Sequence, residues 1–185
     1  LIETCANSYA GQIPLILKIN SSNSLSRNSD APTQAITGSI SEAIRLGCSA
    51  IGFTIYPGSD DSLNMISEIQ ELAAEAKSLG LAVVVWSYPR GGNISKEGET
   101  ALDIVSYAAH MAALIGAHII KVKPPTEFLE DSNAKKVYID NNIPISTLKD
   151  RIKNVVESCF QGKRIVIFSG GSSKDTEGLL NEIRD

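Results

Sequence analysis

The sequence predicts an α/β protein in which parallel strands alternate with helices. A unit of amphipathic helix, glycine and short apolar strand occurs four times, in RLG-CSAIGFTIY (45–56), SLG-LAVVVWSY (78–88), LIG-AHIIKVK (114–123) and FQG-KRIVIFSG (160–170). A fifth apolar run, PLILKIN (14–20), precedes these units. The expected strand starts lie roughly 32–46 residues apart, which is the room that one strand and its crossover helix need.

Composition restricts the class of protein. The chain has 185 residues, 43% of them hydrophobic, and a formal net charge of −4. These values predict one globular domain spanning residues 1–185. The mild acidity argues against a nucleic-acid partner, and no apolar run approaches the ~20 residues of a membrane span.

Cysteines and histidines restrict the chemistry. Cys5, Cys48 and Cys159 are widely spaced and odd in number, which indicates reduced thiols and a cytoplasmic protein. His110 and His118 are too few for the usual catalytic zinc site, so we expect no metal and no cofactor. Neither a dinucleotide-binding nor a P-loop glycine motif is present.

The helices have local signals of their own. Ser39 and Glu42 form the pattern of a capping box. Apolar residues recur at helical spacing between 65 and 79, between 102 and 115 and between 148 and 159. Left-handed helix ends are expected at four glycines: Gly47, Gly80, Gly116 and Gly162. The polar stretches 20–37 and 124–145 are interpreted as loops over the working face.

Polar side chains break each apolar strand at its carboxyl end, two residues apart. The pairs are Lys18 and Asn20, Thr54 and Tyr56, Trp86 and Tyr88, Lys121 and Lys123, and Ser169 and Gly171. Because residues i and i+2 share one face of a strand, all five strands point such groups in one direction. An open doubly wound sheet does not need this convergence, whereas a (βα)8 TIM barrel has its active site there. The sequence therefore favours the barrel.

Lys121 is the strongest candidate for a reactive group. It lies within an apolar strand, and Lys123 follows on the same face. Desolvation and a neighbouring positive charge both favour a neutral lysine, the form that makes a Schiff base with a ketone or aldehyde. The alternative is that both lysines reach solvent or bind a phosphate.

Two further elements fit such a site. Tyr88 is a candidate acid/base next to an imine, although it and Trp86 are also consistent with simple packing. The segment FSGG (168–171) ends a strand with two glycines before an expected helix. Backbone N–H groups in that arrangement bind phosphate well.

These segments resemble the archaeal-type class I fructose-1,6-bisphosphate aldolases. The resemblance rests on PLILKIN, SAIGFTIYPGS (49–59), VVVWSYPRGG (83–92), GAHIIKVK (116–123) and FSGG. It implies a (βα)8 barrel that cleaves fructose 1,6-bisphosphate through a lysine imine without a metal, in glycolysis and gluconeogenesis. By motif position Lys121 resembles the imine-forming lysine, Tyr88 the acid/base, Trp86 and Lys123 substrate-positioning residues, and Ser169, Gly170 and Gly171 the phosphate loop.

The chain also departs from that family. The Asp-His-Gly segment of the family's first strand and the Gly-Arg pair near its eighth are absent. We therefore expect five strands, at family positions three to seven, in a barrel domain incomplete at both ends. The expected partners are a phosphorylated sugar and further copies of the chain. The alternatives are a related lysine-dependent aldolase or autoinducer-processing thiolase, or a non-catalytic sugar-phosphate-binding barrel.

Overall fold

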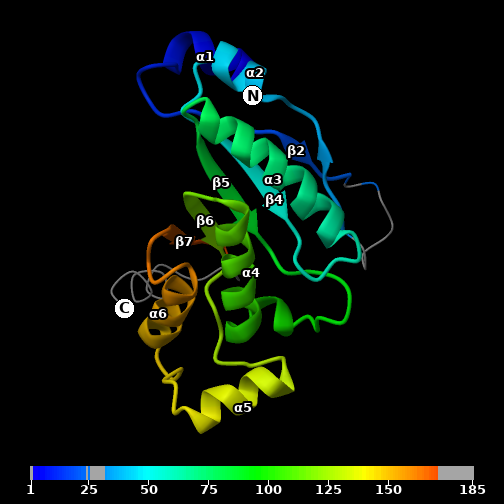
Figure 1. The fold of residues 1–185 in the computed structure, drawn as a ribbon, viewed down its shortest axis with the longest axis vertical. Coiled ribbons are helices and arrows are strands. Elements are labelled where there is room, and N and C mark those ends of the chain that lie inside the picture. The colour runs from blue at the N-terminus through cyan, green and yellow to red at the C-terminus, as the bar shows by residue number, and fades with distance from the viewer. Residues whose placement is uncertain (1, 24, 26–31, 171–185) are drawn as a thin grey trace.

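The computed structural model describes residues 2–23, 25 and 32–170, and within them a parallel sheet covered by helices (Figure 1). The sheet has the strands β1 (Ile16–Lys18), β4 (Ala50–Ile55), β5 (Ala82–Ser87), β6 (Ile119–Val122) and β7 (Ile165–Phe168). They pair in the order β1-β4-β5-β6-β7, every pair parallel. Neighbours in space therefore follow the order of the chain, as predicted, and no strand order reverses about a switch point.

Helices connect the strands and pack on one face of the sheet. They are α2 (Ile40–Arg45), α3 (Ser62–Ser78), α4 (Leu102–Ile115) and α6 (Leu148–Ser158), and the 3-10 helix η1 (Gly98–Thr100) precedes α4. The Ser39 capping box is present, and the four predicted glycines all have positive φ. Helix α1 (Ile2–Tyr9) lies with α2 at one end of the molecule, opposite α5 (Ser132–Asp140) (Figure 1).

The core lies between the sheet and these helices. Alternate residues of the strands point into it and are fully buried, among them Ile51, Phe53, Val83, Val85, Ile120 and Val122. The opposite face is not covered in the same way: Ile16, Ile165 and Ile167 are 39%, 61% and 43% exposed. A doubly wound sheet would have helices on both faces, whereas the wall of a barrel has them outside only.

Two stretches that were predicted to be loops contain regular structure. Residues 20–37 include the short antiparallel pair of β2 (Asn20–Ser21) and β3 (Ala35–Ile36). Residues 124–145 include α5, whose first turn is capped by the Asp131 carboxylate. The prediction missed α5 because its apolar face is short, with Ala134, Val137 and Tyr138 spanning little more than one turn of a polar stretch, and because none of its side chains is buried.

Among the residues that the structure describes, no helix is both long and apolar enough to cross a membrane.

Candidate active site

The uncovered face of the sheet carries the predicted site residues in three successive rows. The first row runs across the sheet as Lys18, Gly52, Val84, Ile119 and Ile165, and the second as Thr54, Trp86, Lys121 and Ile167. The third row consists of the residues that directly follow β4, β5, β6 and β7, which are Tyr56, Tyr88, Lys123 and Ser169. The strands are parallel, so these side chains lie at the same end of the sheet, as predicted.

Lys121 lies in the middle row, between an aromatic and an aliphatic neighbour. Its strand partners are Trp86 on β5 and Ile167 on β7. The residue is half-buried, and no hydrogen bond or ion pair engages its ammonium within the described part of the chain. An amine without a partner beside apolar walls is well placed to add to a carbonyl group.

Trp86 lies across β4, and Gly52 makes room for it. A Cβ atom on Gly52 would lie 2.1 Å from Cζ3 and 2.5 Å from Cη2 of the indole. The missing side chain thus lets the ring lie against the strand backbone. This contact fixes one wall of the space next to Lys121.

Gly52→Ala is expected to displace the indole. The φ of Gly52 is not positive, so the effect is steric and should cost about 1–3 kcal/mol of stability, as overpacking usually does. Trp86 is the single tryptophan, and its emission spectrum should therefore shift. Gly80→Ala is the control, because Gly80 has open space around it and strains only the backbone. An unchanged emission spectrum in Gly52→Ala would contradict this packing.

Tyr88 follows β5, and its backbone N–H donates to the Ile55 carbonyl oxygen over 3.1 Å. Burial raises the pKa of its phenol, a shift that Arg90 opposes and Tyr56 supports. The hydroxyl is therefore protonated at neutral pH, which is the state in which a phenol donates a proton.

Lys18 lies on the edge strand β1, where its ammonium belongs to a polar network. Its ammonium donates to the backbone and side-chain oxygens of Asn20 and, over 3.0 Å, to Oε1 of Gln34. The Gln34 amide in turn donates to the Tyr56 hydroxyl over 2.8 Å, and the Arg90 guanidinium lies 5.7 Å from the centre of that ring. Desolvation of the ammonium lowers the pKa of Lys18, although the residue as a whole is exposed. Its acceptors make Lys18 less available as a nucleophile than Lys121.

Lys123 forms an ion pair that the sequence did not reveal. Its Nζ lies 3.5 Å from Oε2 of Glu99, and both side chains are largely buried. The carboxylate offsets the positive charge that was expected to act on Lys121.

The predicted phosphate loop is described only in part. Ser169 follows β7, but its backbone N–H donates to the Val122 carbonyl oxygen over 3.0 Å, as part of the sheet. Gly170 has a φ of 90°, and Gly171 lies outside the described residues. The Ser169 hydroxyl and the Gly170 N–H are thus the described groups that an anion can use.

Both histidines lie away from this end of the sheet. His118 Nδ1 accepts from the Val83 N–H over 3.0 Å, and His110 Nδ1 bonds to the Ser158 carbonyl oxygen over 2.8 Å. Among the residues described here, no three histidine, cysteine or acidic side chains gather as a metal site would require.

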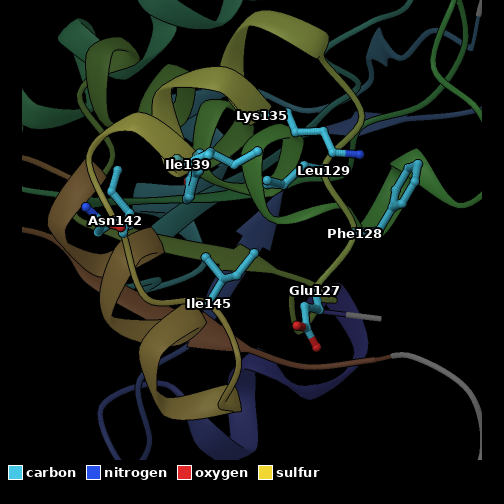
Figure 2. Close-up of a pocket in the computed structure, with 9 residues that line it drawn as sticks. Glu127, Phe128, Leu129, Lys135, Ile139, Asn142 and Ile145 are labelled. Carbon is cyan, nitrogen blue, oxygen red and sulfur yellow. The ribbon is translucent and has the colours of Figure 1, made fainter.

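A pocket of about 550 Å³ lies next to α5, and Lys18, Lys121 and Lys123 are not among the residues that line it (Figure 2). Apolar side chains such as Leu129, Ile139 and Ile145 line it, with Glu127 and Lys135 among its polar groups. We assign the site to the side chains at the strand ends, because a (βα)8 barrel carries its active site at the carboxyl ends of its strands, whereas this pocket lies between α5 and the loops that flank it.

The sequence did not reveal that the Asn20 side chain hydrogen-bonds to the neighbouring strand β4, and it gave no signal for Gln34 or Glu99 as parts of the site. The Asn20 amide bonds to both the N–H and the carbonyl oxygen of Thr54, each over 2.8 Å. These residues act across 16 to 34 positions of sequence, for which no local pattern exists.

Parallel strands in sequential order, with helices outside and reactive side chains at the carboxyl ends, define the wall of a (βα)8-barrel enzyme. The family model of the DeoC/LacD aldolases matches residues 1–185, and the chain belongs to that family.

Similar proteins support this assignment. The class 1 fructose-bisphosphate aldolase of Thermoproteus tenax is 44% identical over 115 residues, which cover 62% of this chain and 42% of that protein. The probable class 1 fructose-bisphosphate aldolase of Chlamydia muridarum is 33% identical over 187 residues, covering 94% and 51%. An archaeal fructose-1,6-bisphosphate aldolase, solved with its catalytic lysine bound to the carbinolamine intermediate, matches with a TM-score of 0.75 at 33% identity. That match covers 98% of this chain and 62% of the solved one. The chain thus spans about half the length of the curated relatives it matches.

Proposed function

We propose that the protein is a class I aldolase that cleaves fructose 1,6-bisphosphate to dihydroxyacetone phosphate and glyceraldehyde 3-phosphate. The observation that carries the proposal is Lys121: a half-buried amine without a partner among the described residues, on the inner face of a barrel strand. The choice of fructose 1,6-bisphosphate as the substrate rests on the relatives that are named fructose-bisphosphate aldolases.

The chemistry follows from the side chains in place. The neutral Lys121 amine adds to the C2 carbonyl of the open-chain sugar, and loss of water from the carbinolamine leaves an iminium ion. A base then removes the proton of the C4 hydroxyl, the C3–C4 bond breaks, and its electron pair moves into the enamine. Protonation of C3 and hydrolysis release dihydroxyacetone phosphate and restore the amine.

Tyr88 is the proposed group that moves protons in this cycle. It is two residues from Trp86, the strand neighbour of Lys121. In this proposal Trp86 and Lys123 position the substrate, and Ser169, Gly170 and Gly171 hold a phosphate. A cytoplasmic protein and a homo-oligomer are expected from the family resemblance.

The test is turnover of fructose 1,6-bisphosphate by the full-length protein in excess EDTA. We expect cleavage to persist, because an iminium ion replaces the Lewis acid as electron sink. Borohydride should inactivate the protein only when dihydroxyacetone phosphate is present. Loss of activity that zinc restores, or the absence of both cleavage and adduct, would overturn the proposal.

One relative points to a second substrate. A Methanocaldococcus jannaschii protein, 32% identical over 93% of this chain, is named both fructose-bisphosphate aldolase and 6-deoxy-5-ketofructose 1-phosphate synthase. An adduct with dihydroxyacetone phosphate, without cleavage of fructose 1,6-bisphosphate, would favour that kind of reaction on another phosphorylated sugar. Binding of sugar phosphate without any adduct would instead indicate a non-catalytic barrel.

A further inference from the structure

The loop between β5 and α4 is fastened to the loop that follows β6. The backbone N–H and the hydroxyl of Ser95 both donate to the Glu130 carboxylate, each over 2.8 Å. Gly98 lies so close to that carboxylate that a Cβ there would be 2.7 Å from its carbon atom. The Thr126 N–H adds a bond of 2.8 Å to the Thr100 carbonyl oxygen. The short helix η1 is therefore fixed to the loop that follows β6.

This attachment places the Glu99 carboxylate at Lys123. Glu99 is only 13% exposed and Lys123 24%, so water screens their attraction weakly. Glu99 also pairs with Lys96 at 3.0 Å, but the Lys96 side chain is 88% exposed, and such pairs contribute little. The partner that matters for Glu99 is thus Lys123.

The site therefore contains two amines on one face of β6 that differ in their partners. The Lys123 ammonium is paired with a carboxylate 3.5 Å away, whereas Lys121 has no partner among the described residues. An ammonium ion has no lone pair and cannot add to a carbonyl group. The two lysines would otherwise compete for the same ketone.

We propose that Glu99 is a positioning residue that directs imine formation to Lys121 by holding the Lys123 side chain to one side in an ion pair. The inference rests on the proposed Schiff-base function and adds to it a residue that selects between the two lysines. Glu99 does not touch the substrate in this scheme and acts through Lys123.

The test compares Glu99→Gln with the parent protein by the reactivity of each lysine. Limited acylation with acetic anhydride at neutral pH, read by tandem mass spectrometry, should show Lys123 measurably more reactive in Glu99→Gln than in the parent, because the carboxylate no longer holds its ammonium. Trapping with dihydroxyacetone phosphate and borohydride should then find adduct on Lys123 as well as on Lys121. In the Lys121→Arg background, Lys123 should be trapped only when Glu99 is also replaced.

Two control variants distinguish the effect of the Glu99 carboxylate on Lys123 from a general change in the loop between β5 and α4. Lys96→Met removes the exposed partner of Glu99 and should leave both reactivities as in the parent. Glu130→Gln loosens the loop but keeps the Glu99 charge, so its effect on Lys123 should be smaller. If Glu99→Gln does not fold, Glu99→Asp should show the same change to a smaller extent.

Acylation tests the role of Glu99, whereas borohydride trapping tests the aldolase function, so that the failure of one can be told from the failure of the other. Unchanged acylation of Lys123 in a folded Glu99 variant, or an equal change in Lys96→Met, would overturn the role of Glu99. Acylation that changes as expected without any borohydride adduct would support the ion pair and overturn the aldolase function instead.

Discussion

Lys121→Arg is expected to abolish the borohydride adduct with dihydroxyacetone phosphate and to lower turnover by roughly 10⁴–10⁶-fold. A guanidinium ion stays protonated and cannot act as the amine nucleophile, and losses of this order follow removal of a covalent nucleophile. The measurement is mass spectrometry of the trapped full-length protein together with steady-state cleavage of fructose 1,6-bisphosphate.

The matched control is Lys153→Arg. Lys153 lies on α6 with a 72% exposed side chain and pairs only weakly with Glu157, so turnover and adduct should match those of the parent. Labelling of Lys18 or Lys123 in the parent protein, or full turnover by Lys121→Arg, would show that the nucleophile has been assigned to the wrong residue.

Tyr88→Phe should separate imine formation from the later proton transfers. We expect turnover to fall by roughly 10²–10⁴-fold, the usual contribution of a positioned acid or base, while the adduct on Lys121 still forms. The raised pKa of Tyr88 keeps the phenol protonated below that pKa. A proton that Tyr88 supplies is therefore available across the neutral range and is lost only as the pH rises through the raised value.

Tyr56→Phe provides the comparison. The Tyr56 hydroxyl is occupied by the Gln34 amide, so its removal should change turnover much less than the loss of the Tyr88 hydroxyl. Equal effects of the two substitutions on turnover, or loss of the adduct in Tyr88→Phe, would contradict the role given to Tyr88.

The five strands were predictable because each is a local pattern. An apolar run after a glycine at a helix end signals a strand without knowledge of its neighbours. The strand starts expected from the sequence, near residues 14, 49, 81, 117 and 163, lie within two residues of those in the structure. The common direction of Trp86, Tyr88 and Lys121 followed from the alternation of side chains along a strand. What these patterns specify is therefore the sheet and the side chains on it.

The partners of those side chains were not predictable. The pairs of Glu99 with Lys123 and of Gln34 with Lys18 join loops to strands, and loops carry no periodicity. The expectation that Lys123 acts on Lys121 as a free positive charge was made without Glu99. Helix α5 was missed because its apolar stripe is too short to stand out: Ala134, Val137 and Tyr138 span little more than one turn, and none of them is fully buried.

Asn20 substitutes for one rung of a strand ladder. Its side-chain amide bonds to both the N–H and the carbonyl oxygen of Thr54 on β4. The backbone of Asn20 itself pairs with β3 instead of β4. Thr54 and its strand neighbour Trp86 therefore keep their positions in the sheet, whatever path the chain takes after Ser21. A change in the length of the chain between Ser21 and Gln34 should therefore leave Thr54 and Trp86 in place, so that this stretch can vary in evolution independently of the strand ends.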